Sequence, residues 1–169
     1  MLLLLDRGAD IDAVGGTYGT ALAVAAGSYR GEEMVLLLLD RGANINAVGG
    51  RYGTALAAAA HQGAGQIVSL LLDRGADINA VGGEYGTALA AAVAAENKDL
   101  VSLLVDGGAD INIVASKFGT VLGQAIYNGS TEIALLLLEH GADVMRVGGS
   151  YSTPSGVYPL ALSHAGWEE

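Results

Sequence analysis

Three histidines are the residues of this sequence that acid–base or metal chemistry would use first. His61, His140 and His164 lie in different repeat units, and they lack the paired carboxylates or the metal-ligand spacing that would assign them a role. Zinc sites and catalytic sites need several such groups to converge. The chain also has no cysteine, which excludes thiolate ligands and disulfides. We therefore expect structural or surface roles for the histidines and assign no catalytic residue.

Recurring aspartates raise calcium binding as an alternative. They are Asp10, Asp77, Asp110 and Asp143, and Asn44 holds the same position in the remaining copy of the pattern. Calcium needs about six oxygens within ~2.5 Å, whereas stacked copies of a helical repeat lie on the order of 10 Å apart. We expect local capping and turn hydrogen bonds from these side chains instead. No metal and no cofactor is predicted.

A recurring glycine pair resembles a phosphate-binding loop only in its glycine content. The copy at residues 49–54 reads Gly-Gly-Arg-Tyr-Gly-Thr. It lacks the Gly-Lys-Ser/Thr ending that holds phosphates, and it does not follow a strand. The glycines are therefore predicted to form turns.

The composition narrows the class of protein further. The chain has 169 residues, 51% of them apolar, and 8 basic against 18 acidic side chains give a net charge of −10. The apolar content excludes intrinsic disorder, and the negative charge disfavours a nucleic-acid partner. The longest apolar run, residues 88–95, is shorter than the ~20 residues of a membrane span. Because Asp6 and Arg7 end the first apolar stretch, we expect no signal peptide, a cytoplasmic location and no membrane contact.

Internal repeats determine the architecture. A leucine-rich tract ends in a glycine that returns every 33 or 34 residues, at Gly8, Gly42, Gly75, Gly108 and Gly141. A second pattern, Gly-Gly-x-aromatic-(Gly/Ser)-Thr, recurs in the same phase. This period indicates one repeat array that covers residues 1–169. Its predicted parts are a half repeat at 1–13, full repeats at 14–47, 48–80, 81–113 and 114–146, and a half repeat with a short insertion at 147–169.

Each unit is predicted to form a helix, a turn, a second helix and an extended finger. Thr54 precedes a run of strong helix formers and is a good N-cap, and Gly75 stands where a left-handed C-cap is needed. The predicted helix, break, helix and finger of this unit are residues 55–60, 63–65, 67–74 and 77–86.

These patterns resemble the ankyrin repeat family, whose first helix opens with Thr-Pro-Leu-His-x-Ala. Residues 20–25 occupy that motif, and residues 68–79 match the Val-x-x-Leu-Leu-x-x-Gly-Ala-x-x-Asn that follows it. Alanine or valine replaces the proline in four units, and alanine or glycine replaces the histidine. This variant is similar to large fungal ankyrin arrays. The resemblance implies an all-α solenoid of helix-turn-helix units with extended finger turns, and a non-enzymatic scaffold that binds another protein and no small-molecule substrate.

Positions that differ between otherwise similar units are candidates for partner recognition, because stacking does not dictate them. Such positions lie at the finger tips and after the first helices. Aromatic residues recur beside the tips, and this regularity favours stacking between fingers, with the tips choosing the ligand. The alternative is that exposed turn residues vary freely. The residues assigned to the surface are Thr17, Tyr18, Arg51, Tyr52, His61, Gln62, Glu84, Tyr85, Lys117, Phe118, Tyr127 and Asn128.

The two ends and the outer leucines suggest self-association as an alternative function. The sequence begins within a second helix and ends after a first helix, so the tail of one copy could continue into the head of another. Three alternatives stay open: a segment of a longer array, a short natural protein, and a structural filament of copies stacked head to tail. The residues assigned to self-association are Leu2, Leu3, Leu36, Leu135, Leu160, Leu162 and Trp167.

Overall fold

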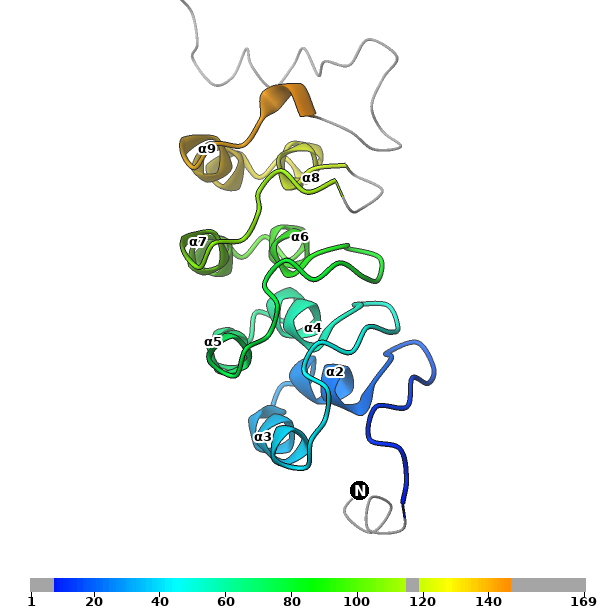
Figure 1. Cartoon of the computed structure of the whole chain (residues 1–169). Coiled ribbons are helices and arrows are strands. Elements are labelled where there is room, and N and C mark those ends of the chain that lie inside the picture. The colour runs from blue at the N-terminus through cyan, green and yellow to red at the C-terminus, as the bar shows by residue number, and fades with distance from the viewer. Residues whose placement is uncertain (1–7, 115–118, 147–169) are drawn as a thin grey trace, which may run out of the picture.

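A computed structural model describes residues 8–114 and 119–146 of the chain. Within these residues the chain forms pairs of short α-helices, one pair in each unit, joined by long loops (Figure 1). The helices are α2 (Ala21–Ala26), α3 (Glu32–Asp40), α4 (Ala55–His61), α5 (Gly65–Asp73), α6 (Ala88–Ala94), α7 (Lys98–Asp106), α8 (Val121–Asn128) and α9 (Thr131–Glu139), followed by the 3₁₀ turn η1 (Val144–Arg146).

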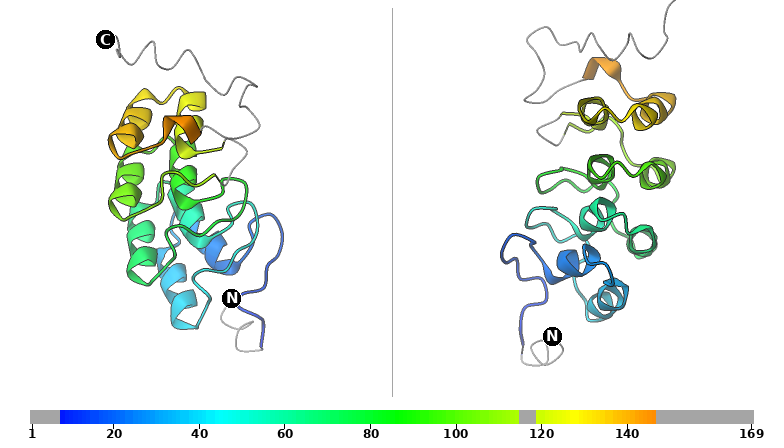
Figure 2. Two further views of the ribbon diagram at one scale, coloured as in Figure 1. Left: turned by 45° about the horizontal axis from the view of Figure 1, so that its top comes forward. Right: turned by 180° about the vertical axis from the view of Figure 1, so that it is seen from behind.

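The helix pairs stack into a two-row solenoid. The first helices α2, α4, α6 and α8 form one row, and the second helices α3, α5, α7 and α9 form the other (Figures 1 and 2). The loops between units project from the side of the first row as fingers. The predicted all-α solenoid is therefore confirmed.

The first helices begin at buried threonines, as predicted for Thr54. Each threonine hydroxyl accepts a hydrogen bond from the backbone N–H three residues later, at 3.1–3.3 Å. This bond satisfies one of the backbone donors that every helix start leaves open. The four capping residues are Thr20, Thr54, Thr87 and Thr120.

The two rows of helices bury different fractions of their surface. In α4 every residue from Ala55 to Ala60 is buried, because α2 and α6 pack against it from both sides. In α5 only Ile67, Val68 and Leu71 are buried. Small side chains let the first helices approach closely, and this two-sided burial accounts for much of the high apolar content.

The break between the two helices of a unit lies one residue earlier than the sequence suggested, at residues 62–64. We expected it at residues 63–65 and the second helix from Ile67, but α5 begins at Gly65. Gly63, with φ +73°, turns the chain by itself, so Gly65 is free to enter the helix. Gly75 has φ +87°, as predicted for a left-handed cap.

Candidate protein-interaction surface

The finger tips are joined by backbone hydrogen bonds. The N–H of Arg51 donates to the carbonyl oxygen of Thr17 at 2.6 Å, and the N–H of Glu84 donates to that of Arg51 at 2.7 Å. Each of the first three fingers is closed at its base by a pair of glycines, which are Gly15 with Gly19, Gly49 with Gly53, and Gly82 with Gly86. The backbone of the tips is therefore fixed by neighbouring fingers, while all three tip side chains are exposed.

An ion pair connects two of these tips. Arg51 Nε lies 3.1 Å from Glu84 Oε2, and this hydrogen bond is the main cause that raises the pKa of Arg51. The guanidinium carbon of Arg51 also lies 5.9 Å from the ring centroid of Tyr52. Arg51 and Glu84, two tip residues predicted to contact a partner, thus form one exposed ion pair.

The finger tyrosines stack on one another. Tyr18 and Tyr52 have ring centroids 6.5 Å apart, and Tyr52 and Tyr85 have centroids 6.1 Å apart. Tyr52 is buried, Tyr85 is half-buried, and Tyr18 is 57% exposed. The stacking expected from their regular recurrence is confirmed for these three rings, and their part in binding is a proposal.

His61 belongs to the same aromatic cluster. Its ring lies 4.7 Å from that of Tyr85 and 5.2 Å from that of Tyr52, measured between centroids. Burial lowers the pKa of His61 below its ordinary value, and the charge of Arg51 lowers it further, while a backbone hydrogen bond at Ala91 opposes both. The buried Nδ1 of His61 has no hydrogen-bond partner among the described residues. The sequence did not predict the packing of His61 against the two tyrosine rings.

The other predicted residues separate into exposed and structural ones. Gln62 directly follows α4, Tyr127 lies in the last turn of α8, and both are exposed. Asn128 is half-buried, and its Nδ2 donates to the carbonyl oxygen of Val93 at 3.4 Å. Two predicted binding residues, Lys117 and Phe118, lie outside the described residues.

The recurring Asp and Asn side chains form the local turn hydrogen bonds that the sequence predicted, and a second Asp or Asn of each unit forms a bond to the next unit that it did not predict. Asp77 Oδ1 accepts from the N–H of Asn79 two residues on, and Asn79 Oδ1 accepts from the N–H of Asp110 in the next unit, at 2.8 Å. The same between-unit bond joins Asp12 to Asn44, Asn46 to Asp77 and Asn112 to Asp143. Backbone donors therefore use these side-chain oxygens at every step of the array.

Comparison with known families agrees with this repeating geometry. A family model described as ankyrin repeats (3 copies) matches residues 1–82 and again residues 56–147. The chain belongs to the ankyrin repeat family. No curated protein matches the sequence significantly. Ankyrin repeats are protein–protein interaction modules, and the family is generally non-enzymatic.

The second helices of the units, α3, α5, α7 and α9, form the outer row of the array and are called the outer helices. They carry the two described leucines that the sequence assigned to self-association. Leu36 on α3 is half-buried, and Leu135 on α9 is 40% exposed. The other five assigned residues lie outside the described parts of the chain, so head-to-tail stacking stays a prediction. They are Leu2, Leu3, Leu160, Leu162 and Trp167.

The fingers also carry a row of exposed valines that was not assigned to the surface from the sequence. Val14, Val48, Val81 and Val114 precede the glycine pairs or their counterpart, and each is more than half exposed. A Cβ added at Gly49 would lie 2.6 Å from Val14 Cγ1, so the valine of one finger covers a glycine of the next. The recurrence of an apolar residue before each Gly-Gly pair was the signal available.

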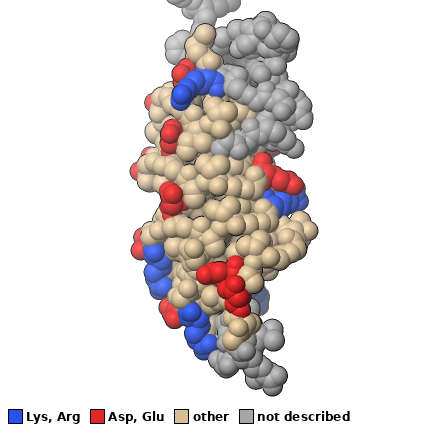
Figure 3. All heavy atoms as spheres, turned by 45° about the vertical axis from the view of Figure 1, so that its right-hand side comes forward, with Lys and Arg blue, Asp and Glu red and all other residues tan. Residues whose placement is uncertain are grey.

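The surface of the ankyrin array is otherwise sparsely charged. Figure 3, which brings the finger side forward, shows small separate groups of acidic and basic side chains on a largely uncharged face. In residues 8–114 and 119–146, no three His, Asp or Glu side chains are grouped as metal ligands would be. Across the same ranges no helix is long and apolar enough to cross a membrane.

Proposed function

We propose that this ankyrin array binds another protein on the surface formed by its fingers and the C-terminal ends of its first helices. The residues that vary between units lie on this surface, and the most exposed of those described are Thr17, Tyr18, Arg51, Gln62, Glu84 and Tyr127. The observation that carries the proposal is the separation of roles within the three fingers whose tips the structure describes. The backbone of the tip is bonded to its neighbours, whereas the tip side chain is free to differ.

This separation is what recognition by a rigid scaffold requires. Fixed backbones lower the entropy lost when a partner binds, because the contact residues are already in place. Stacked tyrosines add large, rigid contact area with a polar end. Tyr52 and His61 are engaged with their neighbours and support the surface from behind, so we assign them a positioning role and assign contact to Tyr18 and the tips.

Short peptides selected from a displayed random library for binding to the intact array test the proposal. The selected peptides are compared on two double variants. Arg51→Ala with Glu84→Ala removes an ion pair from the fingers. Lys98→Ala with Glu132→Ala removes an ion pair of 2.9 Å from the outer helices α7 and α9, and it is the matched control.

The proposal predicts that the first double variant loses the peptides and that the second keeps them. Both pairs are exposed and join neighbouring units, so the comparison removes general effects of losing a surface ion pair. Peptides that still bind the Arg51/Glu84 double variant but no longer bind the Lys98/Glu132 double variant would contradict the proposal.

A further inference from the structure

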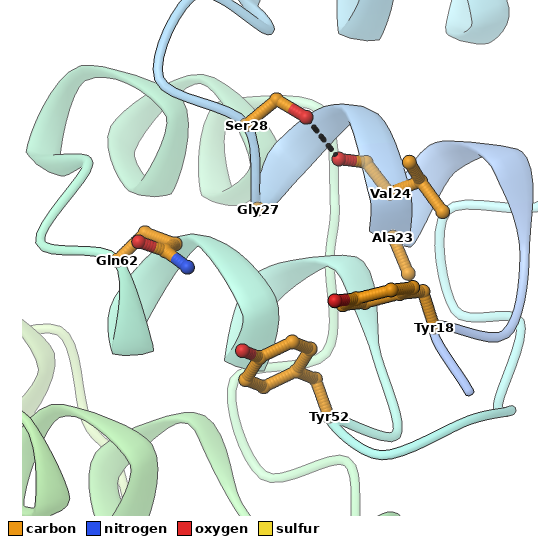
Figure 4. Close-up of a pocket in the computed structure, with 7 residues that line it drawn as sticks. All are labelled: Tyr18, Ala23, Val24, Gly27, Ser28, Tyr52 and Gln62. Atoms are coloured by element: carbon orange, nitrogen blue, oxygen red, sulfur yellow. Dashed lines mark hydrogen bonds between the residues drawn. The ribbon is translucent and has the colours of Figure 1, made fainter.

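A hollow of about 280 Å³ opens between the first two fingers and the end of α2. The phenol rings of Tyr18 and Tyr52 line one side, and Val24, Gly27 and Gln62 lie around the rest (Figure 4). Pockets for small-molecule ligands usually measure ~300–1,000 Å³, so this hollow is nearer to the size of one inserted side chain.

The next unit shows what fills the equivalent space. His61, the last residue of α4, places its imidazole against the rings of Tyr52 and Tyr85. Tyr52 and Tyr85 are the counterparts of Tyr18 and Tyr52, one unit further along the array. In the second unit, the space equivalent to the hollow is therefore filled by the imidazole of the chain's own His61.

The first unit lacks that ring because its counterpart of His61 is Gly27. Thr20 and Thr54 begin equivalent helices, and Gly27 and His61 each stand seven residues after them. Glycine is a poor helix former, and α2 ends one residue before it. The stacking also differs: the rings of Tyr18 and Tyr52 are inclined by 26°, whereas those of Tyr52 and Tyr85 are inclined by 12°.

The chemistry of the lining favours an uncharged aromatic ring. Tyr18 is 57% exposed, so its ring is accessible for stacking, and no lining residue carries a charge. The Ser28 hydroxyl at the rim already donates to the carbonyl oxygen of Val24 at 2.6 Å. The Gln62 amide is exposed at the other rim and is suited to bond a polar ring edge.

We propose that this hollow receives an aromatic or neutral imidazole side chain of the bound protein, in the position that His61 occupies in the next unit. This inference rests on the proposed function and names the chemistry that the first unit recognises. The partner's ring would complete a series of stacked rings that runs from Tyr18 to Tyr85.

The Gly27→His variant tests the hollow directly, because it supplies the missing ring from within the chain. A Cβ at Gly27 would lie 3.3 Å from the carbonyl oxygen of Ala23 and 3.6 Å from Ala58 Cβ, and φ is −82°, so a side chain is accommodated with little adjustment. Gly27→Ala is the matched control, since it adds the Cβ and leaves the hollow open. Tyr18→Leu is a second variant that removes one exposed ring and does not depend on Gly27.

The probes are N-acetyl-tryptophanamide and, as a non-aromatic comparison, N-acetyl-leucinamide. Binding is measured by NMR shifts of the amides of Gly27, Ser28 and Gln62. We expect the aromatic probe to bind the natural chain and Gly27→Ala alike, and to bind about two- to tenfold more weakly to Gly27→His and to Tyr18→Leu, the factor that one aromatic pair contributes. Equal binding of both probes, or equal binding to the natural chain and Gly27→His, would overturn the inference.

The peptides selected on the intact array separate this inference from the proposed function. Peptides that need the Arg51 and Glu84 side chains, carry an aromatic residue and weaken on Gly27→His support both. Peptides that need those finger side chains, lack an aromatic residue and bind Gly27→His as tightly as the natural chain overturn the inference about the hollow and leave the proposed function standing. Peptides that bind away from the fingers overturn both. Occupation of the hollow by a second copy of the chain, seen as shifts of the same amides with protein concentration, also overturns it.

Discussion

Arg51 and Glu84 stand at the tips of neighbouring fingers and are joined twice. The N–H of Glu84 donates to the carbonyl oxygen of Arg51 at 2.7 Å, and Arg51 Nε lies 3.1 Å from Glu84 Oε2. The backbone bond holds the fingers in register whatever side chains the tips carry. The side-chain pair is exposed and is therefore available to a partner.

Replacing both Arg51 and Glu84 by alanine should leave thermal stability nearly unchanged. Exposed ion pairs add little to folding, because water already solvates both charges, and the backbone bond between the tips remains. Thermal unfolding followed by circular dichroism checks this. A large fall in the melting temperature would show that the side-chain pair, and not the backbone, holds the fingers together.

Gly53→Ala should destabilise the array more than Gly75→Ala. Both glycines have positive φ, +81° and +87°, so both variants carry the cost of a left-handed alanine, about 1–2 kcal/mol. A Cβ at Gly53 would also collide with the backbone of Gly82 in the next finger, whereas one at Gly75 meets nothing within 4 Å. We expect an additional loss of about 1–3 kcal/mol for Gly53→Ala from this overpacking.

Urea unfolding of the two glycine variants gives the comparison. Because Gly75→Ala carries the same backbone strain, the difference between the variants isolates the contact between fingers. Equal losses would mean that the fingers separate easily, and the rigid surface proposed above would then lack its support.

Thr54→Ala should lower the free energy of unfolding by about 1 kcal/mol, and Thr54→Ser by much less. The threonine hydroxyl accepts from the N–H of Ala57 at 3.1 Å in a buried position, and only serine keeps that acceptor. Chemical denaturation of both variants measures the difference. If alanine and serine cost the same, the methyl group of Thr54 matters and the cap does not.

His61 should make the array less stable at mildly acidic pH. Its pKa in the folded protein is lowered by burial and by Arg51, whereas in the unfolded chain it returns to about 6.5. Below that pH the unfolded chain takes up the proton first, so the contribution of His61 to the free energy of unfolding falls as the pH drops from about 6.5 toward the folded pKa, and is constant below it.

The His61→Phe variant isolates this effect because it keeps an aromatic ring and cannot titrate. Its free energy of unfolding, measured against pH beside the natural chain, should lack the part of the decline that His61 causes. Identical pH profiles for the two proteins would mean that burial of His61 does not affect its protonation.

The sequence predicted the features that each unit carries in its own residues. Thr54 as an N-cap, Gly75 as a left-handed cap and the Asp and Asn hydrogen bonds of the fingers all follow from local chemistry. The stacking of Tyr18, Tyr52 and Tyr85 followed from their identical position in successive units.

Features that join different positions of neighbouring units could not be predicted in the same way. The stacking of His61 on Tyr85 depends on where the end of one helix meets the next finger. The ion pair of Arg51 with Glu84 needs the distance between tips, and the hollow at Gly27 is visible only by comparison with the filled position in the next unit. The period of the sequence gives the order of these residues but not the offset between fingers and helices.

The central claim is that the fingers and first-helix ends form the binding surface, and mapping a selected peptide by NMR tests it most directly. The amides that shift when the peptide is added to the natural chain should be those of Thr17, Arg51, Gln62, Glu84 and their neighbours. Shifts confined to the outer helices, around Lys98 on α7 and Glu132 on α9, would contradict the claim.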